Sequence, residues 1–264
     1  MLPGAVPASP GARAKANSRV LKLAPGKAPR KRAAGGSGGG AALGKPPGGE
    51  GLAGHSLSLN GAGGTLEFSR LDKGLLVKAL ALVGEQTAKP GESCEVKVAL
   101  PAPLAASPAG QPAGLLRYDV AFEACPFSFD VLDDAVLISS SSLTCDFKQA
   151  GCQVTVSGLW GPGSASFTPT KAKEIEHART RWEAAVRAAF RDATALAKDN
   201  NAVKQAAKEQ AGFSSEREEK CRDYAGEGSF GFCAARLTQA RAFGLRARTA
   251  QALVVDTAGK KGKK

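Results

Sequence analysis

Six cysteines are the residues whose type and spacing point most directly to chemistry. None of them forms the close C-x-x-C pairs that are typical of zinc ribbons and thioredoxin-like sites, so disulfide bonds are the favoured use. Six cysteines allow about 15 connectivities. Proximity in sequence favours Cys145 with Cys152 and Cys221 with Cys233, which leaves Cys94 with Cys125. The alternative is a set of six reduced, buried thiols in a cytosolic protein.

The last two cysteines lie in an ordered pattern of helical spacing. It predicts two helices joined by a short loop, with Cys221 ending the first helix and Cys233 starting the second, where a disulfide would connect them. The residues that define the pattern are Gln210, Phe213, Arg217 and Glu218 before the loop and Thr238, Arg241 and Leu245 after it.

This pattern resembles the LprI-like lysozyme-inhibitor family over about Val203 to Arg248. The helical module of that family carries a Gln, an aromatic residue, an Arg with an acidic neighbour and a Cys, followed by Cys, Thr, Arg and Leu. Where the family usually has Trp and Asp, this chain has Phe213 and Glu218, and Lys171 to Asn200 contains no earlier cysteine pair. The resemblance implies a helical module and, as an activity, the inhibition of a lysozyme.

The formal net charge of +12 is concentrated at the two ends of the chain. Residues 1–49 contain nine basic and no acidic residues, the last six residues contain four lysines, and acidic and basic residues balance between Gly51 and Asp256. A folded surface that binds nucleic acid would need the positive excess on the folded part. We therefore expect only weak binding of polyanions, by the basic ends.

Composition divides the chain into four parts, with an α+β fold in the middle. Residues 1–64 are rich in Ala, Gly and Pro and are predicted to be a disordered basic arm. Alternating apolar residues predict an antiparallel β domain of about six to eight strands over residues 65–163. Residues 164–254 are predicted to be a module of three helices, over about 171–198, 202–221 and 232–251, and residues 255–264 a basic tail.

Disulfides and the resemblance predict a periplasmic or extracellular protein of the bacterial envelope. The start of the sequence conflicts with this, because Met1 to Arg32 contains no apolar run of the roughly 7 to 15 residues that a signal peptide requires. No stretch approaches the ~20 apolar residues that would span a bilayer.

The sequence predicts neither an active site nor a metal or cofactor site. Of the two histidines, His55 falls in the predicted arm and His177 lies off the apolar face of its helix. Asp130, Asp133 and Asp134 are explained as residues at the end of a strand and in a turn. We expect Arg217 and Arg241 either to pair with carboxylates, such as Glu218 or Glu183, or to stack on Trp182 or Phe213.

The loop between the two cysteines is the predicted partner-binding site, because a disulfide would reduce the cost of ordering it. Asp223 and Glu227 would steer a basic lysozyme, and Tyr224 and Ser229 would insert into its cleft. The alternative is an ordinary acidic connection between helices. We thus expect a non-enzymatic binding protein that inhibits a lysozyme, or else an envelope structural or adaptor protein whose helical module binds another partner.

Overall fold

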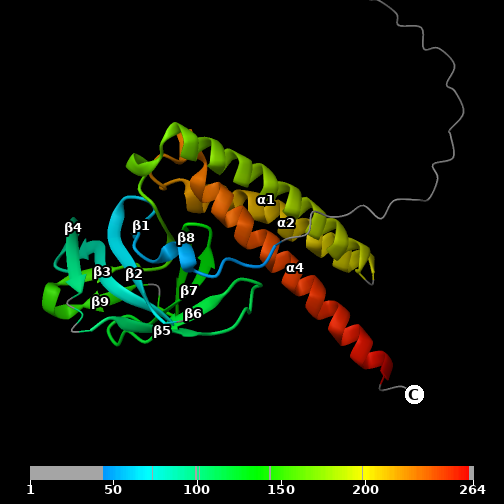
Figure 1. Ribbon diagram of the computed structural model, residues 1–264, viewed down its shortest axis with the longest axis horizontal. Coiled ribbons are helices and arrows are strands. Elements are labelled where there is room, and N and C mark those ends of the chain that lie inside the picture. Colours follow the sequence, from blue (N-terminus) through cyan, green and yellow to red (C-terminus); the bar gives the residue numbers. More distant parts are fainter. Residues whose placement is uncertain are drawn as a thin grey trace, which may run out of the picture. The chain divides into compact units, whose positions relative to one another are not determined.

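The computed structural model describes residues 44–72, 74–98, 100, 102–142, 144–197 and 199–261, all within one compact unit (Figure 1). It confirms the α+β class, with strands followed by helices. The predicted disordered arm extended too far along the chain, because a 3₁₀ helix at Glu50–Leu52 and the first strand both lie before residue 65. Leu52 and Leu57 in this segment are almost fully buried. Residues 1–43 of the predicted arm lie outside the described residues.

One antiparallel sheet contains all eleven strands of the described residues, more than the six to eight that were predicted. The strands are β1 (Ser56–Leu59), β2 (Gly63–Leu71), β3 (Gly74–Gln86), β4 (Lys89–Val98), β5 (Leu104–Pro108), β6 (Arg117–Val120), β7 (Phe127–Leu132), β8 (Ala135–Ser140), β9 (Cys145–Phe147), β10 (Cys152–Val154) and β11 (Gly158–Gly161). Their order is β2-β1-β11-β8-β7-β6-β5-β3-β10-β9, with β4 also paired to β3. β2, the first strand of this order, also pairs with β3.

Alternation of side chains along the strands explains the core of the sheet. In β3, Leu75, Val77, Leu80 and Leu82 are buried while Lys78 is exposed. The register with β2 shifts here, because the consecutive residues Glu67 and Phe68 pair with Ala79 and Val77 and leave Lys78 as an extra residue in β3. The side chains of a strand alternate between faces, so one extra residue moves the buried positions of β3 from odd-numbered (Leu75, Val77) to even-numbered residues (Leu80, Leu82).

The helices are α1 (Pro169–Ala195), α2 (Asn200–Cys221), α3 (Glu227–Phe230) and α4 (Phe232–Lys261). α1 begins two residues before the predicted residue 171: Thr168 caps the helix by accepting a hydrogen bond from the Lys171 amide, and Pro169 is its first residue. α3 was not predicted, and α4 runs to Lys261, so the predicted basic tail began too early.

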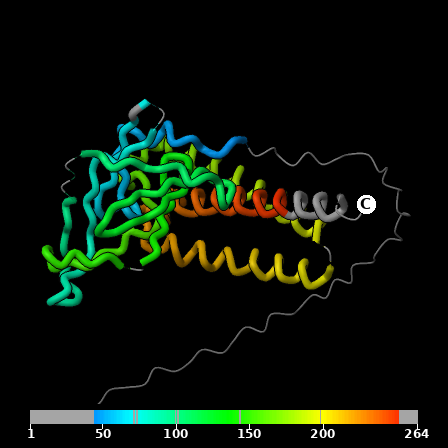
Figure 2. Tube along the Cα trace, turned by 90° about the horizontal axis from the view of Figure 1, so that it is seen from below, coloured from blue at the N-terminus to red at the C-terminus, as the bar shows by residue number. Residues whose placement is uncertain are grey.

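α4 packs mainly against α1, and α2 contacts both of these helices (Figure 1, Figure 2). The side chains of Trp182 on α1 and Phe243 on α4 are in contact, with ring centroids 5.5 Å apart. The same core includes Leu132, Ala135 and Leu159 from β7, β8 and β11, so the helices pack on that part of the sheet. No helix among the described residues is long and apolar enough to cross a membrane.

All six cysteines form disulfides, but two of the three predicted pairings are wrong. The observed pairs are Cys94–Cys152, Cys125–Cys145 and Cys221–Cys233. Cys145 and Cys152 are close in sequence, yet Cys145 lies opposite Val154 and Cys152 opposite Phe147 in the β9–β10 register. Cysteines in this diagonal relation are about 7 Å apart or more, which is too far for a disulfide.

Candidate binding site at the helix hairpin

The Cys221–Cys233 disulfide closes the connection between α2 and α4 as predicted. Cys221 is the last residue of α2 and Cys233 the second residue of α4, and their Cα atoms are 5.5 Å apart. Both cysteines are buried. The short helix α3 occupies part of the closed segment, so the connection is more regular than the predicted loop.

The structure corrects the prediction that Tyr224 inserts into a partner, because its side chain is only 3% exposed. Its hydroxyl donates a 2.9 Å hydrogen bond to the carbonyl of Pro162, and its ring lies 5.5 Å from that of Phe232. A Cβ atom on Gly161 would come within 2.6 Å of the Tyr224 hydroxyl, so the contact with β11 requires glycine there. Burial raises the pKa of this hydroxyl. Tyr224 therefore anchors the hairpin to the sheet.

Glu227 also has an internal role that the sequence analysis missed. Its carboxylate accepts hydrogen bonds from the amides of Cys233 (2.8 Å) and Ala234 (2.9 Å), two of the unpaired amides in the first turn of α4. A negative charge is favourable at that end of a helix. The prediction that Glu227 steers a partner is therefore replaced by a capping role. Asp223 and Ser229 are exposed and stay available.

The aromatic residue of the pattern explains how α2 attaches to α4. Phe213 is half-buried, and the guanidinium carbons of Arg217 and Arg241 lie 5.7 Å and 5.4 Å from its ring centroid. Arg217 also donates a 3.0 Å hydrogen bond to the hydroxyl of Thr238 on α4. Stacking on Phe213 is thus confirmed for both arginines, whereas no described ion pair joins Arg217 to Glu218.

The other pattern residues differ in their surroundings. Leu245 is buried in the helical core and Thr238 donates a hydrogen bond to the Ala234 carbonyl within α4. The amide oxygen of Gln210 is buried without a hydrogen-bond partner. Glu218 is exposed. Most of the pattern therefore serves the packing of the hairpin, and only Glu218 faces solvent.

A cavity of about 330 Å³ opens beside the disulfide, and we refer to it as the arginine pocket. Arg179 in its wall is paired with Glu183 at 3.1 Å, whereas Arg222 has no ion pair with any described residue. Guanidinium groups bind carboxylates and phosphates through two parallel hydrogen bonds. The lining residues are Arg179, Arg217, Glu218, Cys221, Arg222, Glu227, Gly228 and Ala234.

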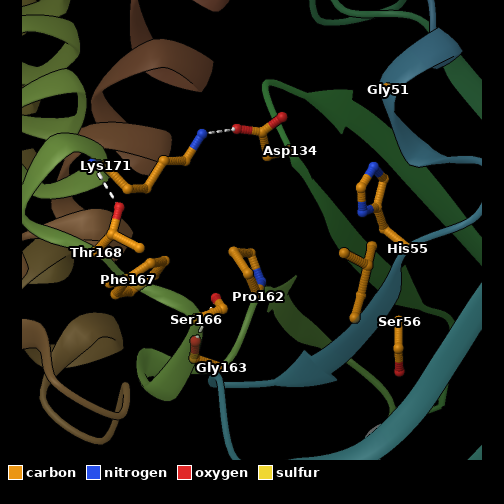
Figure 3. A pocket seen from close by; sticks show the side chains of 11 residues that line it. Gly51, His55, Ser56, Asp134, Pro162, Gly163, Ser166, Phe167, Thr168 and Lys171 are labelled. Atoms are coloured by element: carbon orange, nitrogen blue, oxygen red, sulfur yellow. Dashed lines mark hydrogen bonds and ion pairs between the residues drawn. The ribbon is translucent and has the colours of Figure 1, made fainter.

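A second cavity, of about 390 Å³, lies between the segment before β1 and the start of α1 (Figure 3). In this junction pocket the side chain of His55 faces the cavity opposite Asp134, which accepts a 2.7 Å hydrogen bond from Lys171. His55 was predicted to lie in the disordered arm and is instead placed at this pocket. Its imidazole forms no hydrogen bond with any described residue, and the Ser56 side chain points away from the imidazole.

The charges at the junction pocket hold the helices against the sheet. Burial raises the pKa of the Asp134 carboxyl, but the hydrogen bond and charge of Lys171, together with the charge of Arg236, outweigh it and leave this pKa below its ordinary value. Arg236 is 3% exposed, with guanidinium nitrogens 3.7 Å from Asp133 and 4.0 Å from Asp134. Arg236 was not among the residues singled out from the sequence, whereas its partners in the β7–β8 turn, Asp133 and Asp134, were named there as turn residues.

The carboxylates considered as acids or bases are engaged in ion pairs. Asp130 accepts two hydrogen bonds from Arg117, at 2.8 Å and 2.7 Å, across the β6–β7 pair. His177 is exposed on α1, as predicted. The described residues contain no group of three or more His, Cys, Asp or Glu side chains that could hold a metal ion.

Comparison with known proteins found no match: no family model, no curated protein and no solved structure is similar to this chain.

Proposed function

We propose that this protein is a non-enzymatic binding protein of the periplasm or the cell exterior that contacts its partner through the closed end of the α2–α4 hairpin. The observation that carries the proposal is the disulfide-closed segment, which is fixed on both sides and still presents charged side chains. Tyr224 fixes it to the sheet, and Glu227 and the disulfide fix it to α4. Arg222 and Asp223 are exposed on this fixed segment, so binding would order few groups.

The oxidised state of all six cysteines supports a location in an oxidising compartment. The proposed non-catalytic role rests on the side chains of the junction pocket. The imidazole in the junction pocket has no hydroxyl or carboxylate hydrogen-bonded to it among the described residues, and Asp134 is bound to Lys171. A nucleophile, a base and a group that orients the base are needed together for covalent catalysis.

A lysozyme is the partner that the resemblance to the LprI-like family supports. Lysozymes are often basic and have a cleft that bears carboxylates. With Tyr224 and Glu227 occupied inside the protein, Asp223 would steer the basic enzyme and Arg222 would pair with a carboxylate. The arginine pocket next to these residues offers further guanidinium groups to the same carboxylates.

The test is a cell-wall lysis assay in which the oxidised full-length chain is titrated against lysozymes of several classes. We expect stoichiometric inhibition that is lost on reduction of the disulfides. The double variant Arg222→Ala/Asp223→Ala should lose inhibition, whereas the matched control Arg191→Ala/Asp192→Ala, an adjacent pair exposed on α1, should retain it.

Two results would reject the proposal in different ways. Full inhibition by the folded Arg222→Ala/Asp223→Ala variant would exclude the hairpin as the contact surface. The absence of inhibition in every lysozyme class would exclude a lysozyme as the partner, and an envelope structural or adaptor protein would then be the better account.

A further inference from the structure

A third cavity, of about 480 Å³, lies between the hairpin and the sheet, and we refer to it as the lysine pocket. Its walls come from β8, β11, the end of α2 and the start of α4. The volume falls within the ~300–1,000 Å³ that is typical of small-molecule sites. The lining residues are Asn60, Leu137, Ile138, Ser139, Ser140, Ser157, Gly158, Leu159, Lys220, Cys233 and Leu237.

The walls of the lysine pocket are largely apolar. Ile138, Leu159 and Leu237 each have less than a tenth of their surface exposed, and Leu137 is half-buried. Leu137 and Leu159 are paired on the helix-facing side of the sheet, and Leu237 faces them from α4. Ile138, next to Leu137 on β8, packs in the core on the opposite face. A hydrocarbon group placed among the three leucines would be removed from water, which is favourable in proportion to the apolar area buried.

The polar groups of this pocket are few, and three of them are unused. Ser140 donates a hydrogen bond to the Pro126 carbonyl, and the Ser157 hydroxyl accepts one from the Ser140 amide. By contrast, the side chains of Lys220, Asn60 and Ser139 form no hydrogen bond or ion pair with any described residue. An ammonium, an amide and a hydroxyl thus remain free to bind a ligand.

Charge at the lysine pocket favours one class of ligand. Among the residues that the structure describes, Lys220 is the one charged side chain that lines this pocket, and no acidic side chain does so. A lone ammonium binds an anion as a point charge and matches a ligand with one negative charge, whereas guanidinium groups can bind two oxygens of one anion at once. The arginine pocket shares no lining residue with the lysine pocket: it includes Cys221 of the disulfide, whereas the lysine pocket includes Cys233.

We propose that the lysine pocket binds a small amphipathic monocarboxylate, such as a medium-chain fatty acid. The carboxylate accepts hydrogen bonds from the ammonium of Lys220, with Asn60 and Ser139 as further donors. The hydrocarbon chain lies against Leu137, Leu159 and Leu237. This site is separate from the hairpin surface proposed to contact a lysozyme, so either proposal can fail without the other.

The test is a titration of the oxidised full-length protein with octanoate, followed by NMR of isotope-labelled methyl groups and by calorimetry. We expect saturable shifts of the Leu137, Leu159 and Leu237 methyl signals. 1-Octanol, which has the same chain without the charge, should bind about tenfold more weakly or worse, equivalent to the loss of about one ion pair. Lys220→Gln should weaken octanoate binding by a similar factor and leave octanol unaffected.

Lys208→Gln is the matched control, because Lys208 is exposed on the same helix and does not line the pocket. This variant should bind octanoate like the unaltered protein. The proposal is overturned if the methyl signals of the pocket do not shift, if Lys220→Gln binds octanoate as tightly as the Lys208→Gln control, or if octanol binds as tightly as octanoate. Circular dichroism of each variant shows that the fold is retained.

Discussion

Replacing Asp133 and Asp134 together by asparagine is expected to destabilise the protein by leaving Arg236 buried without an anionic partner. The side chain of Arg236 is 4% exposed, and its nearest carboxylate oxygens are 3.7 Å and 4.0 Å away. Its Nε and Nη1 atoms form no hydrogen bond with described residues. The two carboxylates and the ring of Phe232, 4.8 Å from the guanidinium carbon, are the groups that compensate for the loss of water.

The expected magnitude follows from the difference between breaking a buried ion pair and replacing it. Removing one side of such a pair costs ~3–5 kcal/mol, whereas replacing the charged group by an apolar one of similar size is often neutral or stabilising. Because Asp133 and Asp134 are themselves partly exposed, at 36% and 46%, we expect a value near the lower limit, about 3 kcal/mol. Arg236→Met should then cost much less than the double asparagine variant.

Chemical denaturation in urea measures these differences at pH 7. Adding Arg236→Met to the double asparagine variant should recover most of the lost stability, because no buried charge remains. Arg181→Gln is the control for the exposed pair with Asp133 at 3.4 Å, and it should cost less than about 1 kcal/mol. The reasoning is refuted if the double asparagine variant loses less stability than Arg236→Met.

Two further predictions concern how the stability of the protein changes at acidic pH and how α2 is attached to α4. Because the pKa of the Asp134 carboxyl is lowered on folding, its pairing with Lys171 stabilises the protein fully above about pH 4 and is lost as the pH falls through the folded pKa. The stability difference between the protein and Asp134→Asn should therefore shrink between pH 5 and pH 3 in denaturation experiments, and a constant difference would contradict this. Phe213→Leu should weaken the docking of α2 by about 1–2 kcal/mol, since two guanidinium stacks are lost while most apolar contact remains. Hydrogen exchange should then become faster in residues 200–221, and unchanged exchange there would show that the stacks contribute nothing.

The fold class and the helical hairpin were predictable because their determinants are local. Period-two alternation in β3, the Thr168–Pro169 cap of α1 and the spacing around Cys221 and Cys233 each depend on residues near one another in sequence. Apolar residues three or four apart must lie on one face of a helix. Such patterns therefore specify an element before its partners are known.

The disulfides of the β domain and the roles of the hairpin residues were not predictable in the same way. Cys94 reaches Cys152 because β4 and β10 both pair with β3 at Gly84, a register that involves strands far apart in sequence. At Gly84 a Cβ atom would overlap the Gln153 carbonyl oxygen, so the close approach of β10 to β3 requires glycine at this position.

Local spacing was enough to predict a β-rich half followed by helices, the oxidisable cysteines and the pairing of Cys221 with Cys233. The tertiary structure decided which charged residues are available to a partner. Tyr224 and Glu227 carry the same side chains as any exposed tyrosine and glutamate, and only the positions of the Pro162 carbonyl and the α4 amides make them internal. Burial depends on residues that are distant in the chain, which local spacing does not encode.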